Sequence, residues 1–282
     1  MIPEPDAWHE WLGRSERRVD RVCAAPLAAL AATLDRDDPE PVHASEVPPL
    51  WHWLYFKPLA RQSELGPDGH ARRGRGTGGR KPPRRMWAGG RFAFEHPLHV
   101  GDEIVRTSRI ADIRAKQGRS GALVFVTLRH EIADARGVAI TEEHDIVYRG
   151  DARPENARPA PQAPADERFA REIAPDPVLL FRYSALTFNG HRIHYDRGYV
   201  TEVEGYPGLI VHGPLIATLL LDLLRREYPR ARVRRFAFKA VSPLFDTDRF
   251  AVCGRPEGGN AFMLWARSHD GALAMQASAE VD

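Results

Sequence analysis

The stretch FNGHRIHYDRGYVTEVEGYPGLIVHG, from Phe188 to Gly213, gathers polar side chains directly before a predicted helix. Leucines recur at helical spacing from Gly213 to about Tyr228, and Pro214 fits the first turn, where its missing N–H costs nothing. The first N–H groups of a helix lack internal partners and carry the positive end of its dipole, so they can hold a negatively charged oxygen. The first N–H groups of this helix are therefore a candidate anion site, with His194 as the candidate group opposite them.

The composition is that of a folded globular protein. The 282 residues are 43% hydrophobic and 9% aromatic, which suffices for one large or two ordinary domains. Forty basic and thirty-eight acidic side chains leave a formal charge of +2, which gives no global reason to expect nucleic acid or an acidic membrane as a partner. We therefore expect any anion site to be local.

Cysteine usage and the N-terminus favour a cytoplasmic protein. Cys23 and Cys253 lie far apart and lack CxxC spacing, so neither a disulfide framework nor a thiolate metal site is predicted. The N-terminus has no basic region followed by an apolar one, and the most apolar run, Leu209 to Leu224, is short and interrupted. We expect a soluble, unprocessed protein.

The first half of the chain is predicted to contain a helix followed by an antiparallel sheet. Residues Trp8 to Leu34 show an apolar face near a 3.6-residue period, with a kink or restart at Pro26. The aromatic run LWHWLYFK, Leu50 to Lys57, fits a strand or a buried loop, either as plain core or as the wall of an acyl pocket. Four β-like segments follow, at 90–96, 103–113, 122–133 and 138–148.

An arginine-rich segment, GPDGHARRGRGTGGRKPPRR from Gly66 to Arg85, precedes this sheet. It is too rich in glycine and arginine to bury a core, so we expect an exposed loop. Three interpretations stay open: a solvated or disordered loop, a loop over the phosphates of a nucleotide-bearing ligand, or an RNA contact, for which interleaved aromatic residues are missing. The candidate phosphate ligands are Arg72, Arg73 and Arg75.

The second half echoes the first. Arg91-Phe92-Ala93-Phe94 recurs 144 residues later (235 − 91) as Arg235-Phe236-Ala237-Phe238, and Pro-Leu and Asp follow at similar spacings in both places. Further strand candidates lie at 232–241, 249–254, 261–268 and 272–281. We predict a duplicated α+β architecture, each domain a helix packed in the concave face of an antiparallel sheet. The domains are 1–149 and 178–282, joined by a Pro/Ala-rich linker at 150–177.

Several chemistries can be weighed on these residues. His191 and His194, spaced i and i+3, could bind a metal with Asp196 or His212, but no zinc pattern such as HExxH is present, so we predict no metal or other cofactor. Ser184 lies in RYSALT, which lacks the GxSxG elbow of a serine hydrolase. A purely structural role for the polar groups stays open. The remaining interpretation is acid–base chemistry on an activated carbonyl compound, with an imidazole moving the proton.

A resemblance narrows this interpretation. The order LTFNGHRIHYD, 186–196, followed by GLIVHGP, 208–214, resembles the hydratase motif of MaoC-like hot-dog proteins. It is most similar to the two-domain branch that contains type 2 hydroxyacyl-thioester dehydratases and mesaconyl-C4-CoA or itaconyl-CoA hydratases. SELGPDGH, 63–70, and MWAGG, 86–90, resemble the N-terminal domain of that branch. The resemblance implies an α+β double hot-dog fold whose N-terminal half completes the acyl tunnel and the CoA site.

The resemblance also assigns roles to residues. The catalytic histidine of the motif falls on His194 and its oxyanion glycine on Gly213. The aspartate of the wider family falls on Asn189, whose amide can orient water but cannot shuttle a proton at ordinary pH. Most of the proton transfer is then left to His194. The candidate helpers are His191, Tyr195 and Asp196.

The predicted function is therefore the reversible hydration of an α,β-unsaturated acyl thioester. The alternatives are a hot-dog thioesterase or a non-catalytic acyl-thioester-binding protein. Thioesterases of this architecture generally use a carboxylate on the central helix, and this helix carries none before Asp222. We expect an acyl-CoA or acyl carrier protein thioester as substrate and no nucleic acid or membrane partner, and a further homodimer stays open.

Arg192 raises the question of substrate class, because it lies between His191 and His194. An unpaired buried guanidinium costs several kcal/mol, so Arg192 either binds a carboxylate of the substrate or turns to solvent or to Asp196. The first alternative favours substrates of the mesaconyl-C4-CoA or itaconyl-CoA type. The substrate-binding candidates are Arg192, His191, Tyr195, His212, Arg72, Arg73 and Arg75.

Overall fold

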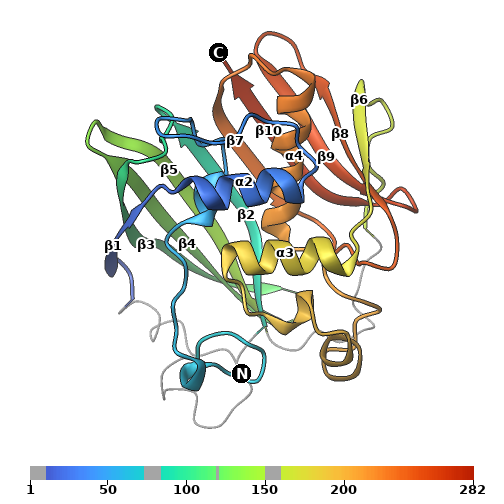
Figure 1. Ribbon diagram of the computed structural model, residues 1–282. Helices are drawn as coiled ribbons and strands as arrows, with labels where there is room; N and C mark the ends of the chain where they lie inside the picture. The colour runs from blue at the N-terminus through green and yellow to red at the C-terminus, as the bar shows by residue number, and fades with distance from the viewer. Residues whose placement is uncertain (1–10, 73–83, 119–120, 150–159) are drawn as a thin grey trace.

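One ten-stranded antiparallel sheet runs through both halves of the chain (Figure 1). The computed structural model describes residues 11–72, 84–118, 121–149 and 160–282. The first half contributes β1 (Ser15–Arg21), β2 (Arg84–Phe94), β3 (Glu103–Gly118), β4 (Gly121–Asp134) and β5 (Gly137–Arg149). The second half contributes β6 (Phe169–Ile173), β7 (Val233–Ala240), β8 (Phe250–Pro256), β9 (Ala261–Ser268) and β10 (Leu273–Val281). All eight strands predicted from the sequence are present.

The strand order shows the duplication directly. It reads β1-β3-β4-β5-β2-β7-β10-β9-β8-β6, so the second half repeats the first in reverse about the junction of β2 and β7. Phe92 pairs there with Phe236, its counterpart 144 residues later in the repeated RFAF tetrapeptide. The two copies of this tetrapeptide therefore hold the halves together, and the predicted duplication is confirmed.

Within the described ranges the sheet is accompanied by the α-helices α2 (Ala24–Thr33), α3 (Pro177–Thr187) and α4 (Gly213–Glu227). α2 and α3 lie side by side across the face seen in Figure 1, and α4 packs against β6, β8, β9 and β10. Every residue of α4 from Leu215 to Leu224 is buried. Asp222 within this run is neutralised by Arg36, Arg171 and Arg226 at 2.7, 3.2 and 2.8 Å.

The halves differ in what precedes their first long strand. In the second half α4 precedes β7, whereas in the first half the corresponding place before β2 is held by η1, a 3-10 helix of four residues from Trp51 to Leu54. The described residues also include the shorter helical turns η2 (Gln62–Glu64), η5 (Arg192–His194) and the single π-helical turn η6 (Tyr199–Val203).

Two predicted elements need correction. Ser15–Arg21, part of the predicted helix Trp8 to Leu34, is the edge strand β1, because it pairs along its whole length with β3. β6 lies inside the predicted linker 150–177 and pairs with β8 as the opposite edge strand. Neither pairing is visible in local periodicity, and residues 1–10 and 150–159 lie outside the described part of the chain.

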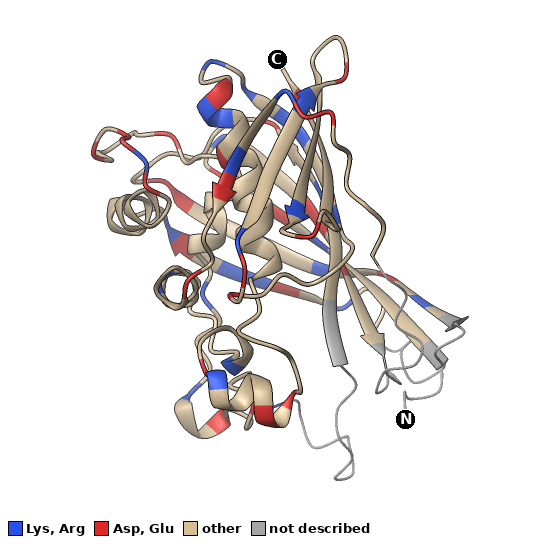
Figure 2. Ribbon diagram, turned by 90° about the vertical axis from the view of Figure 1, so that its right-hand side faces the viewer, with Lys and Arg blue, Asp and Glu red and all other residues tan. Residues whose placement is uncertain are grey.

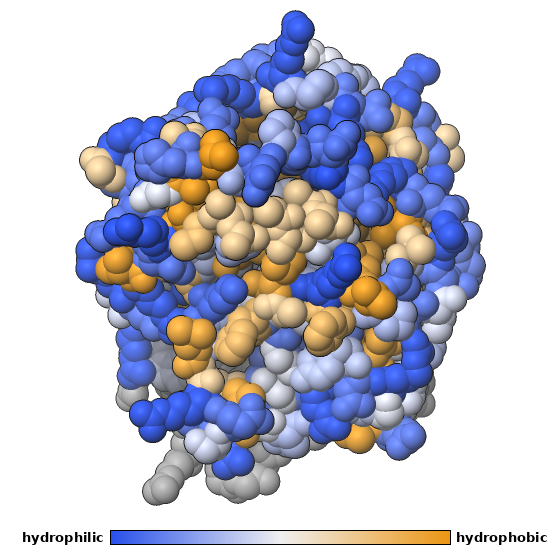
Figure 3. Space-filling view, viewed as in Figure 1, coloured by the Kyte–Doolittle hydropathy of each residue, from blue (hydrophilic) through white to orange (hydrophobic). Residues whose placement is uncertain are grey.

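The surface carries both charge signs in alternation. Figure 2 shows Lys and Arg mixed with Asp and Glu over helices and strands. Apolar residues gather on the face over α2 and α3 (Figure 3), where Val178 and Phe181 of α3 are exposed. Among the described residues, no helix is both long and apolar enough to cross a membrane.

Candidate active site

The residues predicted to carry the chemistry lie between α3 and α4. α3 ends at Thr187, and Phe188 turns the chain in the left-handed conformation, with φ of 55°. The side-chain oxygen of Asn189 then accepts a hydrogen bond from the N–H of His191 at 3.0 Å. This turn leads into η5, whose last residue, His194, has a buried side chain.

His194 is held in one tautomer by a backbone carbonyl. Its Nδ1 lies 2.7 Å from the carbonyl oxygen of Ile210. Because a carbonyl can only accept, Nδ1 carries the proton and Nε2 of the neutral ring keeps its lone pair. Burial lowers the pKa of His194 to about 4, so the ring is neutral at pH 7. His194 is therefore prepared to accept a proton at Nε2.

His212 supports the ring of His194 from one side. The two rings stack with centroids 3.7 Å apart and planes 18° from parallel. Nε2 of His212 lies 2.8 Å from the Ser184 hydroxyl, and burial lowers the pKa of His212 well below its usual value. Nδ1 of His212 has no hydrogen-bond partner among the described residues, so these residues form no Ser-His-carboxylate triad.

Helix α4 begins beside open space. His212 is its N-cap residue, Pro214 lies in the first turn, and that turn carries no acidic side chain. A Cβ atom added to Gly213 would meet no described atom within 4 Å. The unpaired N–H groups and the positive end of the helix dipole can therefore receive a negatively charged oxygen from a ligand.

The first half contributes a loop to this site. Gly69 and Gly190 meet backbone to backbone: a Cβ atom on Gly69 would lie 1.8 Å from the carbonyl oxygen of Gly190. The N–H of Arg192 donates to the carbonyl oxygen of Asp68 at 2.9 Å. Part of the segment predicted to be a solvated or phosphate-binding loop thus packs against the motif that carries His194.

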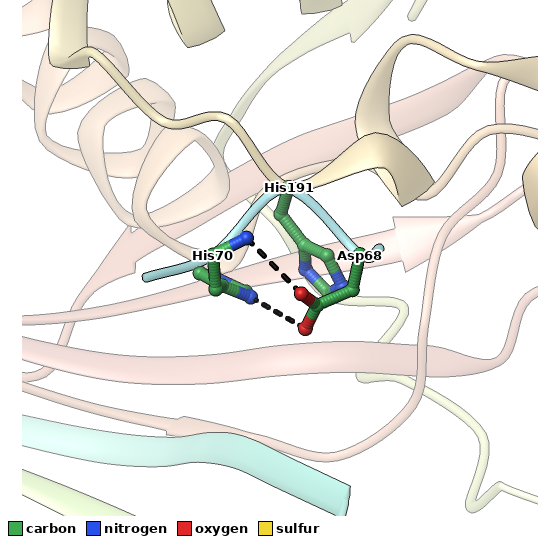
Figure 4. A group of neighbouring side chains, drawn as sticks. All are labelled: Asp68, His70 and His191. Carbon is green, nitrogen blue, oxygen red and sulfur yellow. Dashed lines mark hydrogen bonds and ion pairs between the residues drawn. The ribbon is translucent and has the colours of Figure 1, made fainter. Parts of the chain in front are cut away.

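Three side chains from the two halves meet at this contact (Figure 4). Asp68 accepts a hydrogen bond from the backbone N–H of His70 at 3.1 Å, and its second oxygen lies 3.2 Å from Nδ1 of His70. The rings of His70 and His191 lie 4.2 Å apart, and the three potential ligand atoms are within 4.8 Å of one another. The sequence interpretation grouped His191 with His194 instead, because the approach of the first half could not be seen.

Arg192 is fully engaged in the same contact. Its guanidinium donates to Asp196 at 2.9 and 2.7 Å and to the carbonyl oxygen of Pro67 at 3.0 Å. It also lies over the ring of Tyr199, 4.3 Å from the centroid. The structure thus shows the predicted alternative in which Arg192 pairs with Asp196, and these contacts give no support to a substrate carboxylate at Arg192.

The other substrate-binding candidates have local partners or cannot be described. The hydroxyl of Tyr195 donates to a backbone carbonyl of the motif at 2.8 Å. Nε of Arg72 donates to the carbonyl oxygen of Leu65 at 2.8 Å. Arg73 and Arg75 lie outside the described residues. Phosphate binding by this segment stays a prediction.

A cavity of about 300 Å³ opens between the two halves. The second half lines it with Asn189 and Pro214, next to the start of α4, and with Tyr183 and Thr187. The first half contributes His52, Trp53, Tyr55, Phe56, Pro58, Trp87, Arg106, Glu142 and His144. The aromatic run around Trp53 therefore forms both core and cavity wall.

Comparison with known proteins identifies the family. The family model described as hydroxyacyl-thioester dehydratase type 2 matches residues 50–246, more than half of the chain. The chain belongs to this dehydratase family. It is 46% identical over 275 residues to mesaconyl-C(4)-CoA hydratase of Chloroflexus aurantiacus, covering 97% of this chain and 98% of that protein. The predicted family and the predicted class of acyl-thioester hydratase or dehydratase are confirmed.

Comparison with solved structures shows that the chain has the predicted double hot-dog fold. A MaoC-like dehydratase from Phytophthora capsici matches with a TM-score of 0.70 at 15% identity, covering 99% of both chains. A Mycobacterium tuberculosis protein described as a double hot dog matches with a TM-score of 0.61 at 13% identity, covering 96% of both chains. At these identities the likeness concerns the fold alone.

Sequence reasoning missed a polar part of the cavity wall. Glu142 is buried, and its carboxylate accepts from Trp53 at 3.0 Å and lies 2.9 Å from Nε2 of His52 and 3.4 Å from Nε2 of His144. Burial alone would raise the pKa of Glu142, but His144 and His52 outweigh it and hold this pKa well below its usual value. The available signal was Glu142 and His144 at alternate positions of one strand, which puts both on one face.

Proposed function

We propose that this enzyme adds water reversibly to an enoyl thioester, converting enoyl-CoA into 3-hydroxyacyl-CoA, with His194 as the group that moves the proton. The observation that carries this proposal is the hydrogen bond from Nδ1 of His194 to the Ile210 carbonyl. It leaves Nε2 as a base on a neutral ring, in the same region as the open start of α4 at Gly213.

The reaction follows from these two features. Nε2 of His194 takes a proton from water as the water oxygen bonds to the β-carbon of the enoyl group. The π electrons move toward the thioester, whose oxygen becomes negative and is stabilised by the N–H groups at the start of α4. The imidazolium then returns its proton to the α-carbon, so no net proton is consumed. Because burial disfavours the charged ring, this return is downhill.

Asn189 is proposed to orient the attacking water. Its side-chain oxygen accepts from the N–H of His191, which fixes the amide at the wall of the cavity. Its NH₂ group can donate to a water oxygen, but an amide does not titrate at ordinary pH. Asn189 thus contributes position, and His194 contributes the proton transfer.

A thioesterase is less well supported by the central helix. Its buried carboxylate, Asp222, is paired with three arginines and lies in the third turn of α4. A carboxylate neutralised in this way is a poor nucleophile or base. Incubation with crotonyl-CoA, following loss of enoyl absorbance and release of free thiol in parallel, tests the proposal. Loss of absorbance without thiol supports hydration, whereas thiol release supports hydrolysis and neither signal supports binding only.

The substrate class is proposed from the relative in Chloroflexus aurantiacus, whose name states mesaconyl-C(4)-CoA. Identity of 46% over nearly the whole of both chains makes a carboxylated enoyl thioester our first candidate. CoA is the proposed carrier, with the arginine-rich segment around Arg72 near its phosphates. We further propose a cytoplasmic enzyme, in line with the free thiols of Cys23 and Cys253, that acts in acyl-thioester or fatty acid metabolism and can form a homodimer.

A further inference from the structure

Arg106 stands out among the charged residues that line the cavity. It lies on β3, and its guanidinium carbon is 5.0 Å from the centroid of the Phe56 ring, another residue of the cavity wall. Its Nε atom is completely buried and has no hydrogen-bond partner among the described residues. No ion pair joins Arg106 to any residue in the described part of the chain.

This buried N–H group is costly unless a ligand completes its hydrogen bonding. A buried donor left without a partner costs about 1–3 kcal/mol, and more when the group is charged, so folded proteins normally pair such groups. The other buried charges near the core follow this rule: Asp222 has three arginine partners, and Glu142 is satisfied by His52 and Trp53. Burial lowers the pKa of Arg106, yet arginine remains protonated at neutral pH.

The acidic group in the same wall does not take the place of such a ligand. Glu142 attracts Arg106 through space, but the carboxylate of Glu142 is occupied by His52, Trp53 and His144. Because these partners already occupy the carboxylate oxygens of Glu142, a second carboxylate brought by a ligand would meet Arg106 as the available cation.

The cavity has the size and the neighbours of a site for a short acyl group. Its volume of about 300 Å³ lies at the lower end of the range of ligand pockets, about 300–1,000 Å³, which is enough for a short branched acyl group. Asn189 and Pro214 line the same cavity, so a ligand in it lies beside the water-orienting amide and the start of α4. Trp53 and Trp87 supply flat apolar walls for an unsaturated carbon skeleton.

We propose that Arg106 binds a carboxylate on the acyl group and thereby selects monothioesters of short unsaturated dicarboxylic acids. This inference rests on the proposed hydration. A guanidinium fork matches a carboxylate with two parallel hydrogen bonds, which fixes the orientation of the bound acid as well as adding affinity. Arg192, engaged by Asp196 and Pro67, is then a residue that positions the loop contact and does not read the substrate.

The test compares mesaconyl-C4-CoA with crotonyl-CoA, which carries the same CoA but no carboxylate. The ratio of their kcat/KM values is measured for the unmodified protein and for Arg106→Met and Arg106→Lys. Since intrinsic reactivity cancels in this comparison, we expect Arg106→Met to lower the ratio by about 10²-fold, as for the loss of a charged bidentate contact. The ratio for Arg106→Lys should lie between those of the unmodified protein and Arg106→Met. Arg109→Met, which removes an exposed arginine from the same strand, is the matched control and should keep the ratio.

Three results would overturn the proposal. Equal losses for both substrates in Arg106→Met would assign Arg106 to folding or to the common CoA portion. An unmodified protein that prefers crotonyl-CoA would exclude a carboxylate site. A further test uses the unmodified protein and the C1 methyl ester of mesaconyl-C4-CoA, whose carboxylate is neutralised. Turnover of the ester equal to that of the free acid would show that no cation of the protein binds this carboxylate. If neither thioester is hydrated, the proposed function fails, and calorimetric binding of the acid against the ester still decides the role of Arg106.

Discussion

The two halves of this molecule share one strand order but differ in what they bury beneath it. The second half buries a fifteen-residue helix, α4, that begins at Gly213 beside His194. The first half has only the four-residue turn η1 at the corresponding place, and its residues line the cavity. The second half thus carries the groups proposed for catalysis, whereas residues of the first half line much of the cavity.

The largest expected difference between the halves is tested by replacing one histidine in each half. We expect His194→Ala to lower kcat by about 10²–10⁴-fold, since it deletes the proposed general base. His52→Gln in the first half keeps an N–H donor toward Glu142 and should lower kcat far less, because His52 contacts Glu142 and not the reacting water. Steady-state kinetics on crotonyl-CoA, with circular dichroism as the folding control, measures both. A folded His194→Ala protein with near-normal kcat removes His194 from the mechanism.

A smaller effect is expected from the loop by which the first half holds the second. In Gly69→Ala the new methyl group would lie 1.8 Å from the carbonyl oxygen of Gly190, at a backbone φ of +87°. The shift forced on the motif should lower kcat by about 10²-fold, as small misplacements of catalytic groups do. Gly137→Ala is the matched control, because Gly137 also has positive φ but nothing within 4 Å. Similar kcat losses in both variants would reduce the effect to backbone strain.

Substitutions at Asn189 test whether catalysis in the second half depends on the amide side chain. We expect Asn189→Ala to lower kcat by about 10-fold, since it loses a hydrogen bond of about 0.5–1.5 kcal/mol that holds the turn at His191. Asn189→Asp keeps the accepting oxygen and should remain folded and active. Wild-type kinetics in Asn189→Ala would rule out the water-orienting role.

The smallest expected difference between the two halves concerns how stability and activity depend on pH. Burial lowers the pKa of His194 in the second half and of His130 in the first half to about 4 in each case. Histidine in the unfolded chain titrates near about 6.5, so unfolding takes up protons below that pH, and stability present above it falls as pH drops toward 4. Activity needs neutral His194 and should therefore show its acid limb near 4, with no inflection near 6.5.

Replacing His130 separates the effect of low pH on stability from its effect on activity. His130→Gln should weaken the acid dependence of the melting temperature, because one buried titrating ring is gone, while the acid limb of kcat/KM stays where it was. A limb that moves with His130 would contradict the assignment of this limb to His194.

Sequence reasoning succeeded where the deciding contacts are local. α4 and the eight long or central strands follow from spacing that one segment carries alone, and His194, Asn189 and Gly213 fall within 25 positions (213 − 189 + 1). It failed where a contact joins distant segments. Gly69 meets Gly190 across 121 positions (190 − 69), and neither residue alone indicates the other.

The same reason explains the strands and side chains that were missed. β1 is a charged segment that becomes a strand only because β3 offers an edge, and β6 likewise depends on β8. Arg106 and Glu142 face the cavity because of pairing register and the packing of the second half. A single sequence holds no record of which face of an isolated strand will be covered.

The pairing of Phe92 with Phe236 has a consequence for how activity depends on dilution. Two separate single-domain chains that met along this edge would need to associate, and their activity per molecule would fall below the dissociation constant. Here one backbone joins both copies, so the effective concentration of one half around the other does not fall when the protein is diluted. Specific activity should accordingly stay constant as the enzyme is diluted to nanomolar levels, where an untethered pair would come apart.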